Sequence, residues 1–199
     1  MSSHEILYLL CCYLLGSIPF GYLIVYLSEG RDIRAAGSGN IGATNVLRSQ
    51  GKLAGLATLA LDILKGALPV LYGRIHFDLP WMALLGGLAV LLGHVFPVFL
   101  RFRGGKGVAA LVGVFLVFHW PSLLAFLAVF FAVLALTRYV SLGSLLGTTA
   151  LFFSVLFTQT VEAAMAAFAM LLLIVFRHRG NVSRLLAGSE RKFAFRKDG

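Results

Sequence analysis

The chain has 199 residues, of which 59% are hydrophobic and 13% charged, and its mean hydropathy is +0.91. A soluble domain of this length has too little polar surface to cover so much apolar material, so the composition excludes an ordinary soluble protein and indicates an integral membrane protein. There are 17 Lys and Arg residues against 8 Asp and Glu, a formal charge of +9, so the parts outside a bilayer should attract anions.

A membrane-crossing helix needs about 20 apolar residues. Five stretches have this character: 6–28, 53–73, 81–100, 140–158 and 160–176. A further apolar stretch, 108–137, is interrupted by HWPS at 119–122 and predicts either one long kinked helix or two short helices. The first stretch follows no basic segment and is too long for a cleaved signal, so we interpret it as the first span.

The distribution of basic residues favours two helices in 108–137. With seven crossings, 15 basic residues, including the tail from Arg177 to Lys197, lie on one face, against Arg74 alone on the other, with Lys65 inside a span. With six crossings, 7 basic residues lie on one face of the membrane and 9 on the other. Because cytoplasmic loops are rich in Lys and Arg, the sequence predicts an all-α protein of seven transmembrane helices, with the N-terminus outside and the C-terminus in the cytoplasm. Residues 1–199 are expected to form one membrane domain.

Three polar segments, 29–52, 101–107 and 177–192, then lie on the cytoplasmic face, where they are expected to converge on one site. Asp62 and Lys65 lie inside the second predicted span, where an unpaired charge costs roughly 2.5–3.5 kcal/mol. Their spacing lets them pair with each other, either to fix helix packing or to support an active-site loop from below. His94, in the third span, is expected to be a core histidine bonded to a neighbouring helix.

The second polar segment, within LRFRGGKGVA at 100–109, has the composition of an anion site. It is not a P-loop, because Lys106 is followed by Gly107 rather than Ser or Thr. Its glycines let backbone N–H groups approach an anion, Lys106 adds charge, and a helix starting near Val108 directs its positive dipole end at the same place. The alternative is a basic turn that anchors to lipid phosphates, which suits Arg101 and Arg103.

The third segment, FRHRGNVSRLLAGSERK at 176–192, follows the last predicted span. A basic tail on the membrane surface explains its arginines and lysines, but not His178 and Asn181 where the span ends. No cluster of His, Cys, Asp or Glu in the sequence has metal-ligand spacing, and we expect no metal and no cofactor. No His is followed five residues later by Asp, the usual signature of acyltransferases that use thioester donors, and there is no G-x-S-x-G elbow.

GSGNIGATNVLR at 37–48, LRFRGGKGVA at 100–109 and HRGNVSRLLAGSERK at 178–192, with D-x-x-K-G at 62–66, closely resemble the bacterial acyl-phosphate:glycerol-3-phosphate acyltransferases. The resemblance implies a seven-helix enzyme of the bacterial inner membrane, with its active site on the cytoplasmic face and no cofactor. It would transfer a fatty acyl group from acyl phosphate to the 1-hydroxyl of glycerol 3-phosphate, giving lysophosphatidate and phosphate in the first step of phospholipid synthesis. Membrane lipid and a soluble enzyme that makes acyl phosphate would be partners, and nucleic acid would not.

Acyl phosphate is already activated, so such an enzyme must hold two phosphates and a carbonyl in line rather than supply a nucleophile. The first and second polar segments would each hold one phosphate, in an order that the sequence leaves open. His178 and Asn181 would orient the hydroxyl or polarise the carbonyl, and either His178 or the departing phosphate would take the proton. The expected catalytic residues are Ser38, Arg48, Lys106, His178 and Asn181. The expected substrate-binding residues are Gly37, Gly39, Asn40, Gly42, Asn45, Arg103, Gly104, Gly105, Gly107 and Ser144.

A carrier for phosphate esters or a lipid flippase is the rival hypothesis. Transporters place substrate near the bilayer midplane and are commonly built from paired repeats. An odd number of helices, no evident internal repeat and polar groups on one face argue against it.

Overall fold

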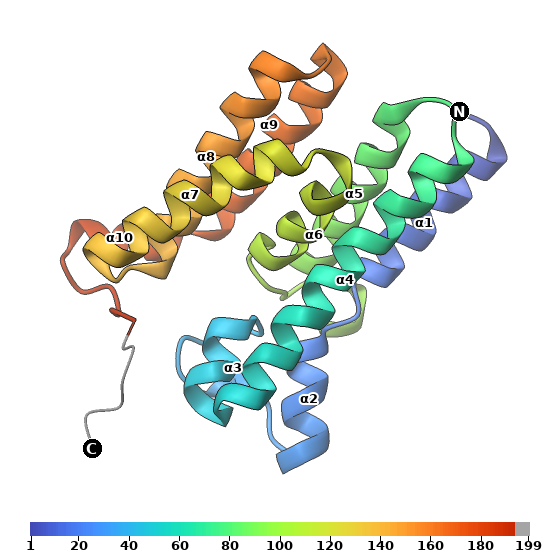
Figure 1. The fold of residues 1–199 in the computed structure, drawn as a ribbon. Coiled ribbons are helices and arrows are strands. Elements are labelled where there is room, and N and C mark those ends of the chain that lie inside the picture. Colours follow the sequence, from blue (N-terminus) through green and yellow to red (C-terminus); the bar gives the residue numbers. More distant parts are fainter. Residues whose placement is uncertain (194–199) are drawn as a thin grey trace. The chain divides into compact units, whose positions relative to one another are not determined.

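The computed structural model describes residues 1–193 as helices joined by turns, and the chain divides into two compact units, Met1–Phe118 and a second that begins at His119 (Figure 1). No β-strand occurs among the described residues, so the predicted all-α class is confirmed. Arg196 and Lys197 of the basic tail lie outside the described residues. A single functional domain over 1–199 stays a prediction.

The first unit is built from α-helices and two short 3₁₀ turns: α1 (Ser3–Gly16), α2 (Phe20–Glu29), η1 (Ile33–Ala35), α3 (Ala43–Gln50), α4 (Lys52–His76), α5 (Pro80–Val95), η2 (Val98–Leu100) and α6 (Val108–Phe118). The second unit contains α7 (Trp120–Thr137), α8 (Val140–Thr158), α9 (Val161–Arg177) and α10 (Arg179–Leu186).

The expected first span is broken in the middle. α1 begins with a capping box in which Ser2 and Glu5 bond reciprocally to each other's backbone N–H. It ends at Gly16, and α2 begins after Pro19, which has no N–H to continue the helical bonding. The break exposes the carbonyl of Ile18 to a new partner, described below.

α4 is the central helix of the first unit, packing against α5 and α6 along its length and against α2 and α3 (Figure 1). Glycines permit these close approaches. A Cβ on Gly66 would overlap the Ala110 carbonyl, and one on Gly113 would overlap the Ile63 carbonyl. Small residues at helix contacts are the usual means of packing helices in a membrane. In the second unit, Gly143 and Gly147 of α8 pack on phenylalanines of α7, as their spacing predicts.

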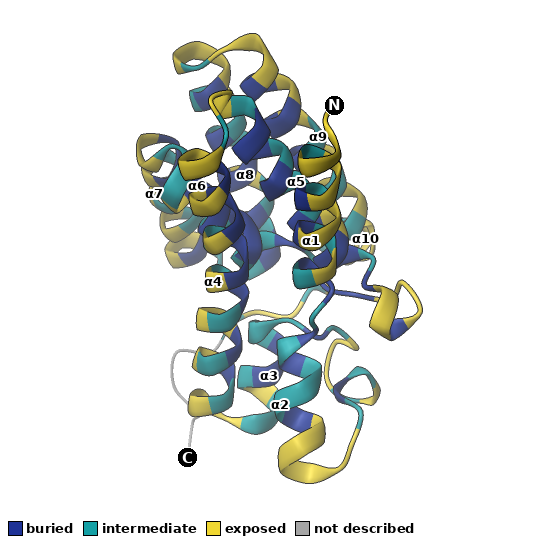
Figure 2. Ribbon diagram, turned by 90° about the vertical axis from the view of Figure 1, so that its right-hand side faces the viewer, coloured by how far each residue is buried: buried dark blue, intermediate teal, exposed yellow. Residues whose placement is uncertain are grey.

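Figure 2 shows buried and exposed residues on the same helices, and many of the exposed residues are large and apolar. Leu27, Leu53 and Leu136 are more than four-fifths exposed, at 81%, 85% and 85%. Exposed apolar side chains in such numbers suit contact with lipid rather than water.

Five described segments are long and apolar enough to cross a membrane: Ser3–Glu29, Lys52–His76, Pro80–Leu100, Trp120–Thr137 and Val140–Thr158. α9 and α10, bent by 58° at their junction, make a sixth candidate if they are counted together. The stretch 108–137 forms two helices that meet at His119, which confirms that reading of HWPS. α6, with 11 residues, is only about 16 Å long, so seven crossings and the orientation of the termini stay predictions.

Two of the three polar segments contain short helices that were not predicted from the sequence. Residues 29–52 contain η1 and α3, and residues 177–192 contain α10. Both short helices, α3 and α10, are amphipathic but contain few apolar residues. Their hydrophobic pattern is therefore much weaker than that of the membrane spans.

Candidate active site

The first polar segment is held by a small apolar core in the first unit. Val25 of α2, Ile33 of η1, Ile41, Val46 of α3 and Leu100 of η2 are buried against one another. Leu100 directly precedes the second polar segment, so this core holds the segments 37–48 and 101–107 side by side. The expected convergence of all three polar segments on one site stays a prediction.

Asn45 is the hub of the first segment. Its side-chain oxygen accepts the N–H of Ser38 at 2.8 Å, and its amide nitrogen donates to the carbonyls of Ala36 at 3.0 Å and Asn40 at 2.8 Å. Asn45 is 3% exposed, because the loop wraps around it. Its side chain is thus engaged in shaping the loop, and this favours a positioning role over the expected substrate contact.

The other predicted residues of this segment lie at its surface or in its turns. Gly37 and Gly39 have positive φ of 62° and 72°, and a Cβ on Gly37 would overlap the Asn45 side chain, so these glycines are required by the turn. Asn40 accepts the N–H of Gly42 at 2.8 Å, which sets up the start of α3.

Two predicted catalytic side chains of the segment are accessible. Ser38 is exposed where the loop turns, and Arg48 is exposed in the last turn of α3. They therefore have the accessibility that a site for a soluble phosphate ester requires.

The glycines of the second segment serve packing more than was expected. The N–H of Gly104 donates to the Val95 carbonyl at 3.2 Å, and that of Gly105 donates to the His94 carbonyl at 3.0 Å. Side chains at either position would overlap the end of α5. Because these two amides are bonded to α5, the suggestion that they cradle an anion loses its support; they fix the loop instead.

Lys106 and Gly107 complete this segment. Gly107 has φ of 87° and its carbonyl accepts the N–H of Leu111 at 2.8 Å, so it forms the junction to α6. α6 begins at Val108, as predicted, with its positive dipole end beside Lys106. Lys106 is half-buried and Arg103 is exposed. This part of the loop keeps the charge and the helix end that anion binding needs.

A buried charge network lies beneath the second segment. Lys65 Nζ is 2.8 Å from Asp62 Oδ1, which confirms the expected ion pair, and the Asp62 oxygen is 3.6 Å from His94 Nδ1. All three side chains are buried. Lys65 also donates to the Ile18 carbonyl at 2.8 Å, in the break between α1 and α2.

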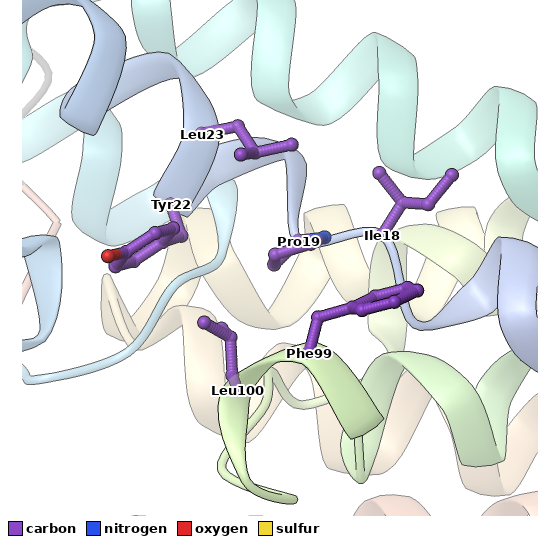
Figure 3. Close-up of a pocket in the computed structure, with 6 residues that line it drawn as sticks. All are labelled: Ile18, Pro19, Tyr22, Leu23, Phe99 and Leu100. Carbon is purple, nitrogen blue, oxygen red and sulfur yellow. The ribbon is translucent and has the colours of Figure 1, made fainter.

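An apolar pocket of about 290 Å³ adjoins the same region (Figure 3). It is lined by Ile18, Pro19, Tyr22, Leu23, Phe99 and Leu100. Figure 3 shows the side chains of Tyr22 and Leu23 on α2 on one side, with Phe99 and Leu100 of η2 on the other. The pocket thus borders the residues that lead into the glycine-rich segment, and its lining suits a hydrocarbon chain.

In the second unit, Glu190 accepts hydrogen bonds from three polar side chains, two of which belong to the third segment. One carboxylate oxygen accepts from Ser141 at 2.8 Å and from Asn181 at 2.6 Å, and the other accepts from Arg184 at 2.8 Å. Asn181, expected to contact substrate, is therefore bonded to Glu190, which fixes its orientation. Glu190 was not among the predicted site residues, although its position as the lone acid in the basic segment 176–192 was a signal that could have identified it.

His178 lies at the junction of α9 and α10 and is 2% exposed. Its Nδ1 is 2.8 Å from the Ile174 carbonyl. A carbonyl only accepts, so Nδ1 carries the hydrogen and Nε2 is the acceptor nitrogen of the neutral ring.

Ser144 on α8 donates to the Val140 carbonyl at 2.8 Å. Its oxygen keeps acceptor capacity, but its proton is used within the helix.

Two carboxylates outside the spans have a lowered pKa. The Arg34 guanidinium, bonded to Asp32 through both oxygens, holds the pKa of Asp32 below its ordinary value. Burial acts to raise the pKa of Glu190, but hydrogen bonds from Asn181, Ser141 and Arg184 together lower it. Both groups are therefore anionic at neutral pH.

Among residues 1–193, no three His, Cys, Asp or Glu side chains are grouped so that they could hold a metal ion.

The sequence matches the family model of glycerol-3-phosphate acyltransferase over residues 6–188. The glycerol-3-phosphate acyltransferase of Geobacter sulfurreducens is 47% identical over 195 residues, covering 96% of this chain and 98% of that protein. The protein of the same name from Myxococcus xanthus is 48% identical over 183 residues, covering 91% and 95%.

A solved structure of PlsY (YgiH), an integral membrane glycerol 3-phosphate acyltransferase, in its glycerol 3-phosphate form has a TM-score of 0.92 and 39% identity over 96% of each chain. Its lysophosphatidic acid form gives a TM-score of 0.88 and 38% identity, again over 96% of each chain. With the apolar helices described above, this similarity supports a multi-pass membrane protein.

Proposed function

This chain belongs to the glycerol-3-phosphate acyltransferase family, and on that premise we propose that it acylates the 1-hydroxyl of glycerol 3-phosphate with acyl phosphate as the donor. The products are lysophosphatidate and inorganic phosphate. The proposal places the reaction at the cytoplasmic face of a bacterial inner membrane, with a soluble enzyme supplying the donor.

The observation that carries the proposal is the pairing, in the first unit, of two basic and polar segments over one apolar core, next to an apolar pocket. Glycerol 3-phosphate and acyl phosphate each bring a phosphate, and one of them brings a hydrocarbon chain. Arg48 with Ser38, and Lys106 with the start of α6, supply two separate groups for phosphates. The pocket lined by Leu23 receives the first part of the acyl chain.

The choice of acyl phosphate follows from what the chain supplies. The sequence has no histidine followed five residues later by aspartate, the pattern that serves thioester donors. A mixed anhydride needs no nucleophilic residue, because its phosphate already leaves readily. Binding and orientation then account for most of the rate acceleration.

In the proposed step, the 1-hydroxyl oxygen of glycerol 3-phosphate attacks the acyl carbonyl carbon. A C–O ester bond forms as the bond from that carbon to the phosphate oxygen breaks. The hydroxyl proton goes either to Nε2 of His178 or to an oxygen of the departing phosphate, which gains negative charge as its bond to the acyl carbon breaks. Asn181, oriented by Glu190, donates to the hydroxyl or to the carbonyl oxygen.

The test is a product assay with purified protein in lipid. Glycerol 3-phosphate is supplied with either acyl phosphate or acyl coenzyme A of the same chain, and lysophosphatidate is measured by mass spectrometry. We expect product with acyl phosphate only, with one inorganic phosphate released per ester formed. Product from acyl coenzyme A alone contradicts the proposed donor, and movement of glycerol 3-phosphate across the membrane without product favours a carrier.

The identity of the base is tested by His178→Asn, which keeps a hydrogen-bonding side chain but removes the titratable ring. A fall in kcat of at least about 100-fold supports histidine as the base, because general-base catalysis typically contributes 10²–10⁴-fold. Near-normal turnover assigns the proton to the leaving phosphate.

A further inference from the structure

The Lys65–Asp62 ion pair of α4 is almost completely buried. The side chains of Lys65 and Asp62 are 1% and 3% exposed, and the two lie one helical turn apart near the middle of a 25-residue helix. A buried ion pair is often no more stabilising than an apolar pair of similar volume. Charged residues inside a membrane protein are costly and commonly serve a function. Helix packing alone therefore does not account for this pair.

Lys65 reaches out of its own helix to the break between α1 and α2. Its Nζ donates to the Ile18 carbonyl at 2.8 Å and lies 5.4 Å from the ring centre of Phe20, the first residue of α2. α2 in turn carries Val25, part of the core under the first polar segment. The lysine thus fixes where α2 begins, and through α2 it fixes the base of that segment.

Asp62 connects the same pair to the second polar segment. Its carboxylate lies 3.6 Å from Nδ1 of His94, and the His94 ring lies directly under Gly105. A Cβ on Gly105 would come within 2.8 Å of His94 Cε1, so the loop backbone rests on the imidazole. Lys106 is the next residue in that loop.

We propose that Lys65, acting through Asp62 and His94 on one side and through Ile18 on the other, is a positioning residue that sets the spacing between the two polar segments of the first unit. This inference rests on the proposed function, in which the two segments hold the two reacting phosphates. The pair touches neither substrate. Its role is to keep the segments at the separation that in-line transfer needs.

The decisive variant is the double substitution Asp62→Asn with Lys65→Met. Lys65→Met alone leaves a buried carboxylate without its cation, so it is expected to lower the melting temperature and cannot separate the two roles. The double variant removes both charges, keeps an oxygen for His94 and preserves volume, and its melting temperature should return close to that of the wild type. It still lacks the donor to the Ile18 carbonyl.

We expect the double variant to lose about 100-fold in kcat/KM for glycerol 3-phosphate, the order of loss that a misplacement of about 1 Å can cause. Tyr8→Phe is the matched control. It removes a buried 2.8 Å hydrogen bond from Tyr8 of α1 to the Pro69 carbonyl of α4, the helix that also carries Lys65. This bond lies away from both polar segments, so the variant should keep wild-type kinetics. A double variant with wild-type stability and wild-type kinetics overturns the proposal, as does an equal loss in Tyr8→Phe.

Hydrogen exchange separates this inference from the proposed function. The amides of Gly104 and Gly105, bonded to α5, should exchange faster in the double variant than in the wild type and in Tyr8→Phe. Unchanged exchange overturns the positioning role even if activity falls. A wild-type protein that makes no lysophosphatidate contradicts the proposed function instead, and the exchange comparison then still decides whether Lys65 holds the segment.

Discussion

Arg48 is the residue whose side chain is most directly testable as a phosphate ligand. It is exposed in the last turn of α3, on a helix held by the buried Val46. Hydrogen bonds to charged groups contribute roughly 1.5–3 kcal/mol, so Arg48→Ala should lower kcat/KM for one substrate by about 10- to 150-fold. Arg48→Lys should fall between, because lysine cannot bind phosphate through two parallel bonds.

Steady-state kinetics with each substrate varied in turn will show which phosphate Arg48 holds. Arg31→Ala is the control, since Arg31 is also an exposed arginine of the first polar segment but is not among the predicted site residues. Unchanged kinetics in Arg48→Ala, or an equal effect in Arg31→Ala, contradicts the assignment.

The free energy of unfolding of the second unit should decrease at acidic pH because of Glu190. Its pKa is lowered in the folded protein, so its stabilising contribution is complete above its unfolded pKa of about 4.3. That contribution is lost as pH falls through the lower folded pKa. Asn181 and Arg184 then lose their anionic acceptor.

The corresponding variant is Glu190→Gln, which cannot ionise. Its melting temperature should lie below that of the wild type at neutral pH, and the gap should shrink as pH falls below about 4. A gap that stays constant over the whole pH range shows that Glu190 does not stabilise the tail through its charge.

At the scale of elements, the pocket between α2 and η2 should select acyl chain length. Leu23 lines it, and a larger side chain there would fill space that the proposal gives to the hydrocarbon chain. Leu23→Phe should therefore shift activity toward shorter donors. Leu27→Phe, one turn further along α2 and 81% exposed, is the matched control. Assays with saturated acyl phosphates of increasing length measure the shift, and an unchanged preference removes the pocket from the acyl path.

Some elements could be predicted from local sequence and others depended on tertiary contacts. The start of α6 at Val108 follows from the glycines before it and the apolar run after it. The use of the Gly104 and Gly105 amides by α5 carbonyls was not predictable, because the acceptors lie nine and eleven residues earlier and only the folded turn brings them near. The same holds for Asn45, whose partners are set by how the loop folds back on α3.

At the scale of the whole molecule, composition was sufficient to identify a membrane protein, since apolar content depends on no contact. The number of crossings was harder to predict, because it depends on α6. An 11-residue helix spans about 16 Å of a hydrocarbon core about 30 Å thick. The non-helical segment before it contains the buried Gly104 and Gly105, whose N–H groups are bonded inside the protein. Such backbone is tolerated at membrane depth when protein surrounds it, and a crossing formed by α6 together with this segment stays a prediction.

Seven crossings with the N-terminus outside can be tested by single-cysteine labelling in intact cells. After Cys11 and Cys12 are replaced, cysteines introduced at Lys52 and Asp78 serve as references, since six or seven crossings place them identically, inside and outside. Arg179, exposed at the start of α10, decides between the counts because an added crossing moves it to the other face. We expect an impermeant maleimide to label position 179 only after permeabilisation, and to label position 120, the first residue of α7, in intact cells. Labelling of position 179 in intact cells contradicts seven crossings. It would also place His178 and Asn181 on the opposite face from Lys52, which precludes a single cytoplasmic site.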